Sequence, residues 1–176
     1  MKKVFLAIMM LLFLAGPCFA AGSSFTVTSD VLVRNYGAGK LNFRVLTLAF
    51  TADDTDGSIP NLTLNPSGWT DGTNTGTFGV MLTGFYAYKI EIDCNHAGTE
   101  PTENSEIYIY QNGFDLLAAG GVDQIDNSVE RQVFFSNGTS PQKQPIVGAL
   151  TVTVTQQAVV TNSATGTIYL ILTVDY

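Results

Sequence analysis

Hydrophobic and polar residues alternate with a period of two along most of this chain. In residues Phe85–Cys94, Tyr86, Tyr88, Ile90, Ile92 and Cys94 fall on one face, and Lys89, Glu91 and Asp93 fall on the other. Successive side chains of a β-strand point to opposite faces, so this pattern predicts a half-buried strand. Further strands are predicted at residues 25–28, 31–34, 41–50, 106–111, 129–135, 150–155 and 168–175.

Within the predicted strand at residues 41–50, Leu41, Phe43 and Val45 alternate with Asn42 and Arg44. This alternation predicts an apolar face that carries Phe43 and Val45. The run then becomes apolar on both faces through residues 46–50, as expected of a central strand.

Turn-forming sequences separate the predicted strands. Asp53–Gly57, Asn112-Gly113 and Asn137-Gly138 combine Gly with Asp or Asn, and Ala119–Gly121 contains two glycines, all of which favours tight turns. Helical periodicity is weak throughout, and the best helix candidate, residues 116–119, is too short. The widest gap, residues 51–77, is expected to be a surface excursion. We therefore predict an all-β fold: an antiparallel two-sheet β-sandwich, jelly-roll or immunoglobulin-like, with about seven to nine strands.

The first twenty residues have the layout of a secretory signal peptide. Lys2 and Lys3 precede an apolar run, and Cys18-Phe19-Ala20 places small residues at the two positions that a signal peptidase reads. We predict cleavage after residue 20, a single β-sandwich domain over residues 21–176, and a secreted, extracellular or cell-surface location without a membrane span. An uncleaved anchor and lipid attachment at Cys18 are the alternatives.

Composition excludes several classes of protein. The 176 residues are 45% hydrophobic and 13% charged, which is too apolar for a disordered chain. The net charge of −7 provides no basic face for nucleic acid. Removing the signal peptide leaves Cys94 as the one cysteine, so the exported chain cannot form an internal disulfide. Its stability must come from core packing, the sheet ladders or assembly.

Two residue groups suggest metal or thiol chemistry. Asp54 and Asp56 lie in an acidic Gly-containing turn that resembles half of a calcium loop, and calcium is the one cofactor considered. The simpler interpretation is a solvated turn stabilised by Asp side chains. Cys94 and His96 stand two apart, as a nucleophile or metal pair could, but a buried thiol beside a loop histidine is the simpler interpretation.

Trp69 and the first strand suggest two binding roles. Trp69 is the one tryptophan and sits in a polar loop, where its ring could stack on a sugar; a loop anchored by one large ring is the alternative. Phe25 and Val27 alternate in a segment that could add to a neighbouring copy as a strand, or could form an ordinary first strand of its own sheet.

The second half of the chain resembles small, uncharacterised β-rich structural proteins of tailed phages and prophages. The segments that carry this resemblance are Pro101–Ile109, Asn112–Leu117, Gly120–Asp123, Gly148–Val152 and Asn162–Thr167. It implies a virion-associated or surface-structural sandwich that assembles rather than catalyses, and it implies no catalytic residue. The predicted signal peptide departs from that pattern, because phage structural proteins normally assemble in the cytoplasm.

These observations lead to one main expectation about function. We expect an exported, non-enzymatic structural or interaction protein, a subunit of a surface or extracellular assembly of filamentous or phage-derived kind, whose partners are further copies or other surface proteins. A surface with few charges is easier to desolvate against a neighbour. A secreted carbohydrate-binding module with a glycan ligand is the alternative. An enzyme built on Glu91, Asp93 and Glu106 ranks third, since any acidic chain offers such groups.

Overall fold

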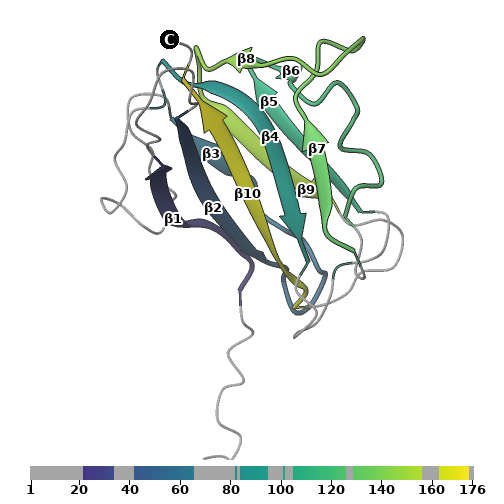
Figure 1. Ribbon diagram of the computed structural model, residues 1–176. Helices are drawn as coiled ribbons and strands as arrows, with labels where there is room; N and C mark the ends of the chain where they lie inside the picture. The colour runs from purple at the N-terminus through teal and green to yellow at the C-terminus, as the bar shows by residue number, and fades with distance from the viewer. Residues whose placement is uncertain are drawn as a thin grey trace, which may run out of the picture.

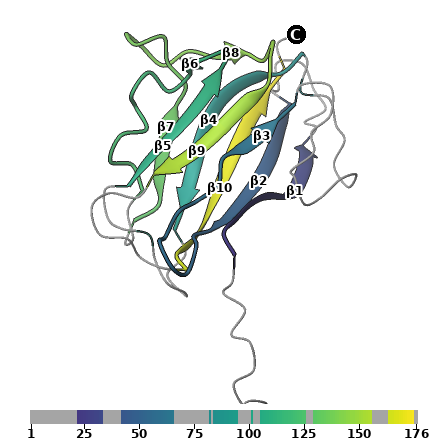
Figure 2. The ribbon, with the colours of Figure 1, turned by 180° about the vertical axis from the view of Figure 1, so that it is seen from behind.

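The protein forms two antiparallel β-sheets that face each other (Figures 1 and 2). The computed structural model describes residues 22–33, 42–65, 82, 84–94, 101, 105–125, 129–155 and 163–174. The predicted signal peptide therefore lies outside the described residues. The described part is all-β, with no helix, as the two-residue periodicity predicts.

Ten strands make up the two sheets. They are β1 (Ser24–Val33), β2 (Phe43–Thr51), β3 (Leu62–Leu64), β4 (Tyr86–Asp93), β5 (Glu106–Gln111), β6 (Phe114–Asp115), β7 (Arg131–Phe134), β8 (Gln144–Pro145), β9 (Leu150–Thr155) and β10 (Thr165–Thr173). The larger sheet has the order β1-β2-β10-β4-β7, and β8 also pairs with β4. The smaller sheet has the order β3-β9-β5-β6. Ten strands exceed the expected seven to nine because β3, β6 and β8 are too short to show periodicity.

The strand pairs are nested. β2 pairs with β10, β3 with β9, β4 with β7 and β5 with β6, all antiparallel. The chain therefore folds like a long double ribbon whose successive strand pairs alternate between the two sheets. β10–β4 and β9–β5 contacts then join these pairs side by side.

A single hydrophobic core fills the space between the sheets. It unites the inward side chains of both sheets, for example Leu46 and Leu48 of β2 with Ile107 and Ile109 of β5. Each large side chain buried in this way contributes about 1.5–3 kcal/mol. Cys94 is buried within this core. In the described part of the chain, core packing and the sheet ladders hold the two sheets together.

Two sequence expectations about local structure are wrong. Residues 51–77 are not wholly a surface excursion, since β3 inserts the buried Leu62 and Leu64 beside β9. Phe43 and Val45 lie on the outer side of the larger sheet, while Arg44, Leu46 and Leu48 point into the core. At the start of this strand, the apolar residues therefore face outward and the charged residue faces inward, which is the reverse of the predicted arrangement.

The face assignment within β4 is also partly wrong. A β-bulge at Tyr88 interrupts the pairing with β10, where Ile171 lies opposite Lys89 and Leu172 opposite Ala87. Ile90, Ile92 and Cys94 share the core face as predicted, but the extra residue places Ala87 there as well. Tyr86 and Tyr88 are therefore excluded from the core face. In the described part of the chain, the structure contains no helix long and apolar enough to span a membrane.

Candidate functional site: the outer face of the larger sheet

The outer face of the larger sheet carries hydrophobic residues in register on four of its five main strands, and Lys89 occupies the same row on the fifth strand, β4. Pairing aligns Val31 of β1, Val45 of β2, Ile171 of β10, Lys89 of β4 and Phe134 of β7 in one row. The adjoining positions add further apolar groups. We define the apolar band as Val31, Val33, Phe43, Val45, Tyr88, Phe134 and Ile171. In Figure 1 this face is turned to the viewer.

A second β-bulge, at Thr28, places the β1 end of this band on the surface. Before the bulge, Phe25 and Val27 point into the core. If the side chains continued to alternate regularly, Val31 would also point into the core. The extra residue at the bulge instead reverses the direction in which each later side chain of β1 points. Val31 and Val33 consequently face outward and are 50% and 43% exposed.

The same bulge brings Asp30 into the interior, where it meets Arg44 of β2. The Arg44 Nε donates to Asp30 Oδ1 at 2.8 Å, and Nη2 donates to Oδ2 at 2.6 Å. The two side chains are 1% and 6% exposed. Arg44 Cζ also lies 5.1 Å from the centre of the Phe85 ring, a cation–π contact. This two-pronged pair fixes the register of β1 on β2 after the bulge.

Aromatic contacts hold the other end of the band. The Tyr88 ring lies 5.6 Å from that of Phe134, edge to face, and 6.3 Å from that of Phe43. Tyr88 is the bulge residue of β4, so it reaches toward both β7 and β2 across the outer surface. Three rings on three strands thus form a connected cluster with few free rotamers.

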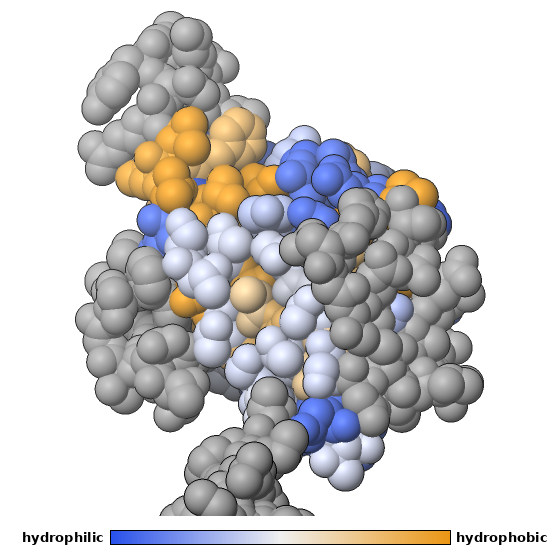
Figure 3. All heavy atoms as spheres, turned by 90° about the horizontal axis from the view of Figure 1, so that it is seen from below, coloured by the Kyte–Doolittle hydropathy of each residue, from blue (hydrophilic) through white to orange (hydrophobic). Residues whose placement is uncertain are grey.

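Charges on this face are confined to one side. In β1 and β2, the charged residues Asp30 and Arg44 both point inward, and the outward positions are Ser, Thr, Ala, Val and Phe. Lys89 of β4, in contrast, forms an outward ion pair of 2.6 Å with Glu91 and also donates to Gln132. The face thus has a neutral part, over β1 and β2, and a charged strip along β4. Much of the coloured surface is also of intermediate hydropathy in the view from below (Figure 3).

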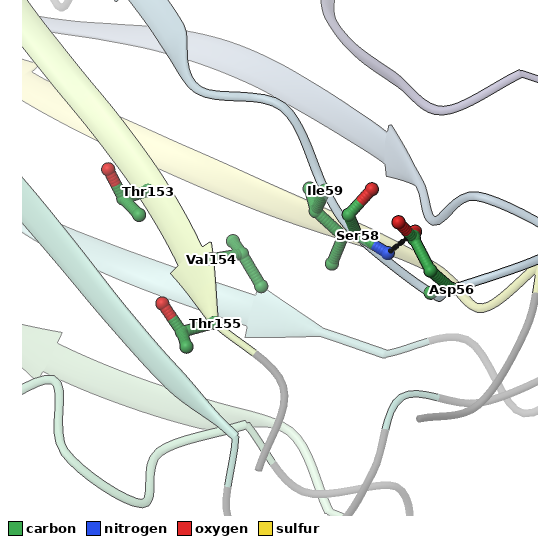
Figure 4. Close-up of a pocket in the computed structure, with 7 residues that line it drawn as sticks. Asp56, Ser58, Ile59, Thr153, Val154 and Thr155 are labelled. Carbon is green, nitrogen blue, oxygen red and sulfur yellow. Dashed lines mark hydrogen bonds between the residues drawn. The ribbon is translucent and has the colours of Figure 1, made fainter. Parts of the chain in front are cut away.

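A separate open groove lies between the acidic turn and the end of β9. It has a volume of about 300 Å³ and is lined by Asp56, Gly57, Ser58, Ile59, Thr153, Val154 and Thr155 (Figure 4). The Ser58 amide donates to the Asp56 carboxylate at 2.9 Å. This hydrogen bond is the main cause that lowers the pKa of Asp56 below its ordinary value of 3.8. The groove therefore offers one carboxylate beside threonine side chains and an aliphatic wall.

The acidic turn hydrogen-bonds to itself. Asp53 Oδ1 accepts from the amides of Thr55 and Asp56, and Asp54 Oδ1 accepts from the Thr55 hydroxyl. Asp54 and Asp56 are not joined by a third acidic, His or Cys ligand among the residues that the structure describes. Calcium binding here stays a prediction. In the structure, the carboxylates accept hydrogen bonds that stabilise the turn.

The remaining predicted site residues fall in different places. Phe25 and Val27 are buried in the core of their own chain, where β1 pairs with β2 as an ordinary first strand. Exchange of this strand between copies stays a prediction. Cys94 is 2% exposed, and His96 and Trp69 lie outside the described residues. The apolar band itself was not predicted, because only the two bulges place its members on one face.

Comparison with models of protein families, with curated proteins and with solved structures gives no match. The resemblance to phage structural proteins therefore stays a prediction.

Proposed function

We propose that this chain is an exported, non-enzymatic structural or interaction protein that docks into a surface or extracellular assembly through the outer face of its larger sheet. Its fold is a jelly roll, an architecture shared by capsid and lectin domains. The four nested pairs, from β2–β10 outside to β5–β6 inside, support this assignment over an immunoglobulin-like one. The proposal includes filamentous and phage-derived assemblies.

The single observation that carries the proposal is the outward placement of Val31 and Val33. Regular alternation would have placed both valines on the core side, where Leu32 now stands and is 41% exposed, and the bulge at Thr28 turns them outward while sending a charged residue inward. That exchange is unfavourable for an isolated domain, since it exposes apolar surface and desolvates a carboxylate. A β-bulge is normally a selected feature that re-aims side chains. A neighbour that covers the band would recover the lost hydrophobic stabilisation.

Chemical protection in producing cells tests this function. Cys94 is buried, so a cysteine introduced at the surface would be the main target for a maleimide reagent. Val31→Cys lies in the apolar band, and Val147→Cys, at a valine that is 70% exposed in the turn before β9, is the matched control. We expect the reagent to label Val147→Cys on intact cells or native assemblies and to spare Val31→Cys until the assembly is dissociated. Equal labelling of both in the native state would contradict the proposal.

The groove beside Asp56 favours glycan binding as the second candidate function. A carboxylate beside threonine hydroxyl groups can accept and donate the hydrogen bonds that sugar hydroxyls offer, and Ile59 supplies an apolar wall. Asp56→Asn should then weaken retention on a polysaccharide column, whereas Asp54→Asn, in the same turn but outside the groove lining, should not. Absence of retention of the unmodified protein on every polysaccharide tried would count against this function.

A further inference from the structure

The backbone ladder between β3 and β9 stops beside the groove. Antiparallel pairing joins Leu62 to Val152, and two residues further along each chain segment the next such pair would join Pro60 to Val154. Proline has no amide hydrogen to donate, so the ladder cannot continue there. The segment before β3 instead forms one wall of the groove, and the end of β9 forms the other (Figure 4).

The peptide groups of Val154 point toward this groove. On β5, the Ile107 amide donates to the Gly121 carbonyl, on the side away from β9. Ile107 lies opposite Val154, so the two form a pair without ladder bonds, and Val154 turns its own amide and carbonyl to the other edge of β9. Val154 is 4% exposed and lines the groove. Among the described residues, no loop amide replaces the donor that Pro60 lacks, and the Val154 carbonyl oxygen is a buried acceptor.

A buried carbonyl without its donor is unfavourable, so a ligand that brings an N–H group gains by entering the groove. The lining also offers the Asp56 carboxylate, the hydroxyl groups of Thr153 and Thr155, and the aliphatic Ile59. We infer that the groove recognises the acetamido group of an N-acetylated amino sugar. This inference rests on glycan binding, the second candidate function, and names the sugar that the same groove takes.

The acetamido sugar matches the lining group by group. Its N–H can donate to the Val154 carbonyl oxygen, and its methyl group can pack on Ile59. The pKa of Asp56 lies below 3.8, so at neutral pH its ionised carboxylate can accept hydrogen bonds from the ring hydroxyl groups. The volume of about 300 Å³ is at the small end of ligand sites and suits one sugar unit. A plain hexose has neither the N–H nor the methyl group and should bind less tightly.

An extended peptide fits the same groove less well. Strand addition gains affinity from several successive backbone hydrogen bonds along an open strand edge. On this edge of β9, β3 already pairs with residues 150–152, and the strand ends at Thr155. Val154 therefore offers a single position. One position suits a single amide group, as an acetamido sugar carries, better than a peptide strand.

Calorimetric titration with two matched oligosaccharides tests the acetamido group. The tetramers of chitin and cellulose differ in one substituent on each sugar, which is acetamido in the first and hydroxyl in the second. We expect the chitin tetramer to bind about tenfold more tightly, the effect of one hydrogen bond and one buried methyl group.

Three results of this titration would overturn the inference. Equal affinities would do so and leave glycan binding standing. Tighter binding of a tetra-alanine peptide than of the chitin tetramer would indicate strand addition instead. Absence of binding to both tetramers would also overturn it, and the polysaccharide columns then decide separately whether glycan binding survives.

A proline variant tests the carbonyl group itself. Pro60→Ala supplies the missing amide hydrogen, which can close the ladder onto Val154, so the preference for the chitin tetramer should be lost. Pro141→Ala, at an exposed proline outside the groove lining, is the matched control and should keep the preference. Both prolines are exposed, and circular dichroism checks that both variants are folded. A folded Pro60→Ala protein that keeps the full preference would overturn the inference.

Discussion

Replacing one member of the buried ion pair between Asp30 and Arg44 gives the sharpest test of what stabilises this fold. Replacing Asp30 with Leu leaves the Arg44 guanidinium in a site where it is 1% exposed, without the two hydrogen bonds of 2.8 and 2.6 Å. The Phe85 ring, 5.1 Å away, offers a cation–π contact that is too weak to replace a carboxylate. The change therefore leaves a buried charge with reduced compensation.

The expected cost is large for one residue. Removing one member of a buried ion pair typically destabilises a protein by about 3–5 kcal/mol. We expect the lower end, about 3 kcal/mol, because Arg44 has other interactions and the strand edge at β1 can relax. For a chain of this size, 1 kcal/mol corresponds to about 2–4 °C, so the melting temperature should fall by about 6–12 °C.

A double-mutant cycle measured by urea unfolding separates the interaction free energy between Asp30 and Arg44 from the contributions that each side chain makes with its other neighbours. Arg44→Met alone should also destabilise, since it leaves the Asp30 carboxylate buried. The double variant, Asp30→Leu with Arg44→Met, should lie within about 1 kcal/mol of the unmodified protein, because two apolar side chains replace the pair. Single costs below about 1 kcal/mol that simply add would refute the reasoning.

Three further predictions concern the smaller sheet and its loops. Gly121→Ala should destabilise by about 3 kcal/mol in thermal unfolding, because its Cβ would stand 1.8 Å from a backbone carbonyl oxygen, whereas Gly22→Ala, with open space, should have little effect. Gln111→Ala should cost about 2 kcal/mol by urea unfolding, since this buried side chain accepts from two loop amides and donates to a carbonyl oxygen. The hydrogen bond to Glu106 raises the pKa of Tyr108 to about 12, so its stabilising contribution is present below pH 10 and is lost as pH rises through 12. Ultraviolet titration should show Glu106→Gln lowering that pKa toward 10.

The local pattern of the chain was enough to predict most strands. Residues 106–111 and 150–155 were predicted with the bounds that β5 and β9 have, and their inward residues are Ile107, Ile109, Leu150, Val152 and Val154 as the alternation requires. The turn at Asn112-Gly113 also follows from sequence, because both residues adopt the positive φ that Asn and Gly tolerate best. These features depend on neighbours one or two residues away, which the sequence displays directly.

The candidate surface could not be predicted in the same way. A bulge adds one residue without a distinctive sequence signal, and it inverts every face assignment that follows in its strand. The bulge at Thr28 is visible only in the pairing with β2, the next strand along the chain, and the bulge at Tyr88 only in the pairing with β10, the last strand. The sequence could not show that Asp30 meets Arg44 inside, nor that Val31 faces out.

The sequence by itself therefore determined that this chain is all-β, where most of its strands run and which residues of β5 and β9 face the core, because alternation and turn chemistry are local properties. Tertiary structure alone decided the order of the strands, the inversion of Asp30 and Val31 and the gathering of an apolar band on one sheet face. The physical reason is that a strand's register and facing are settled by long-range pairing, where the best overall burial and the satisfaction of buried charge outweigh the alternation of any single segment.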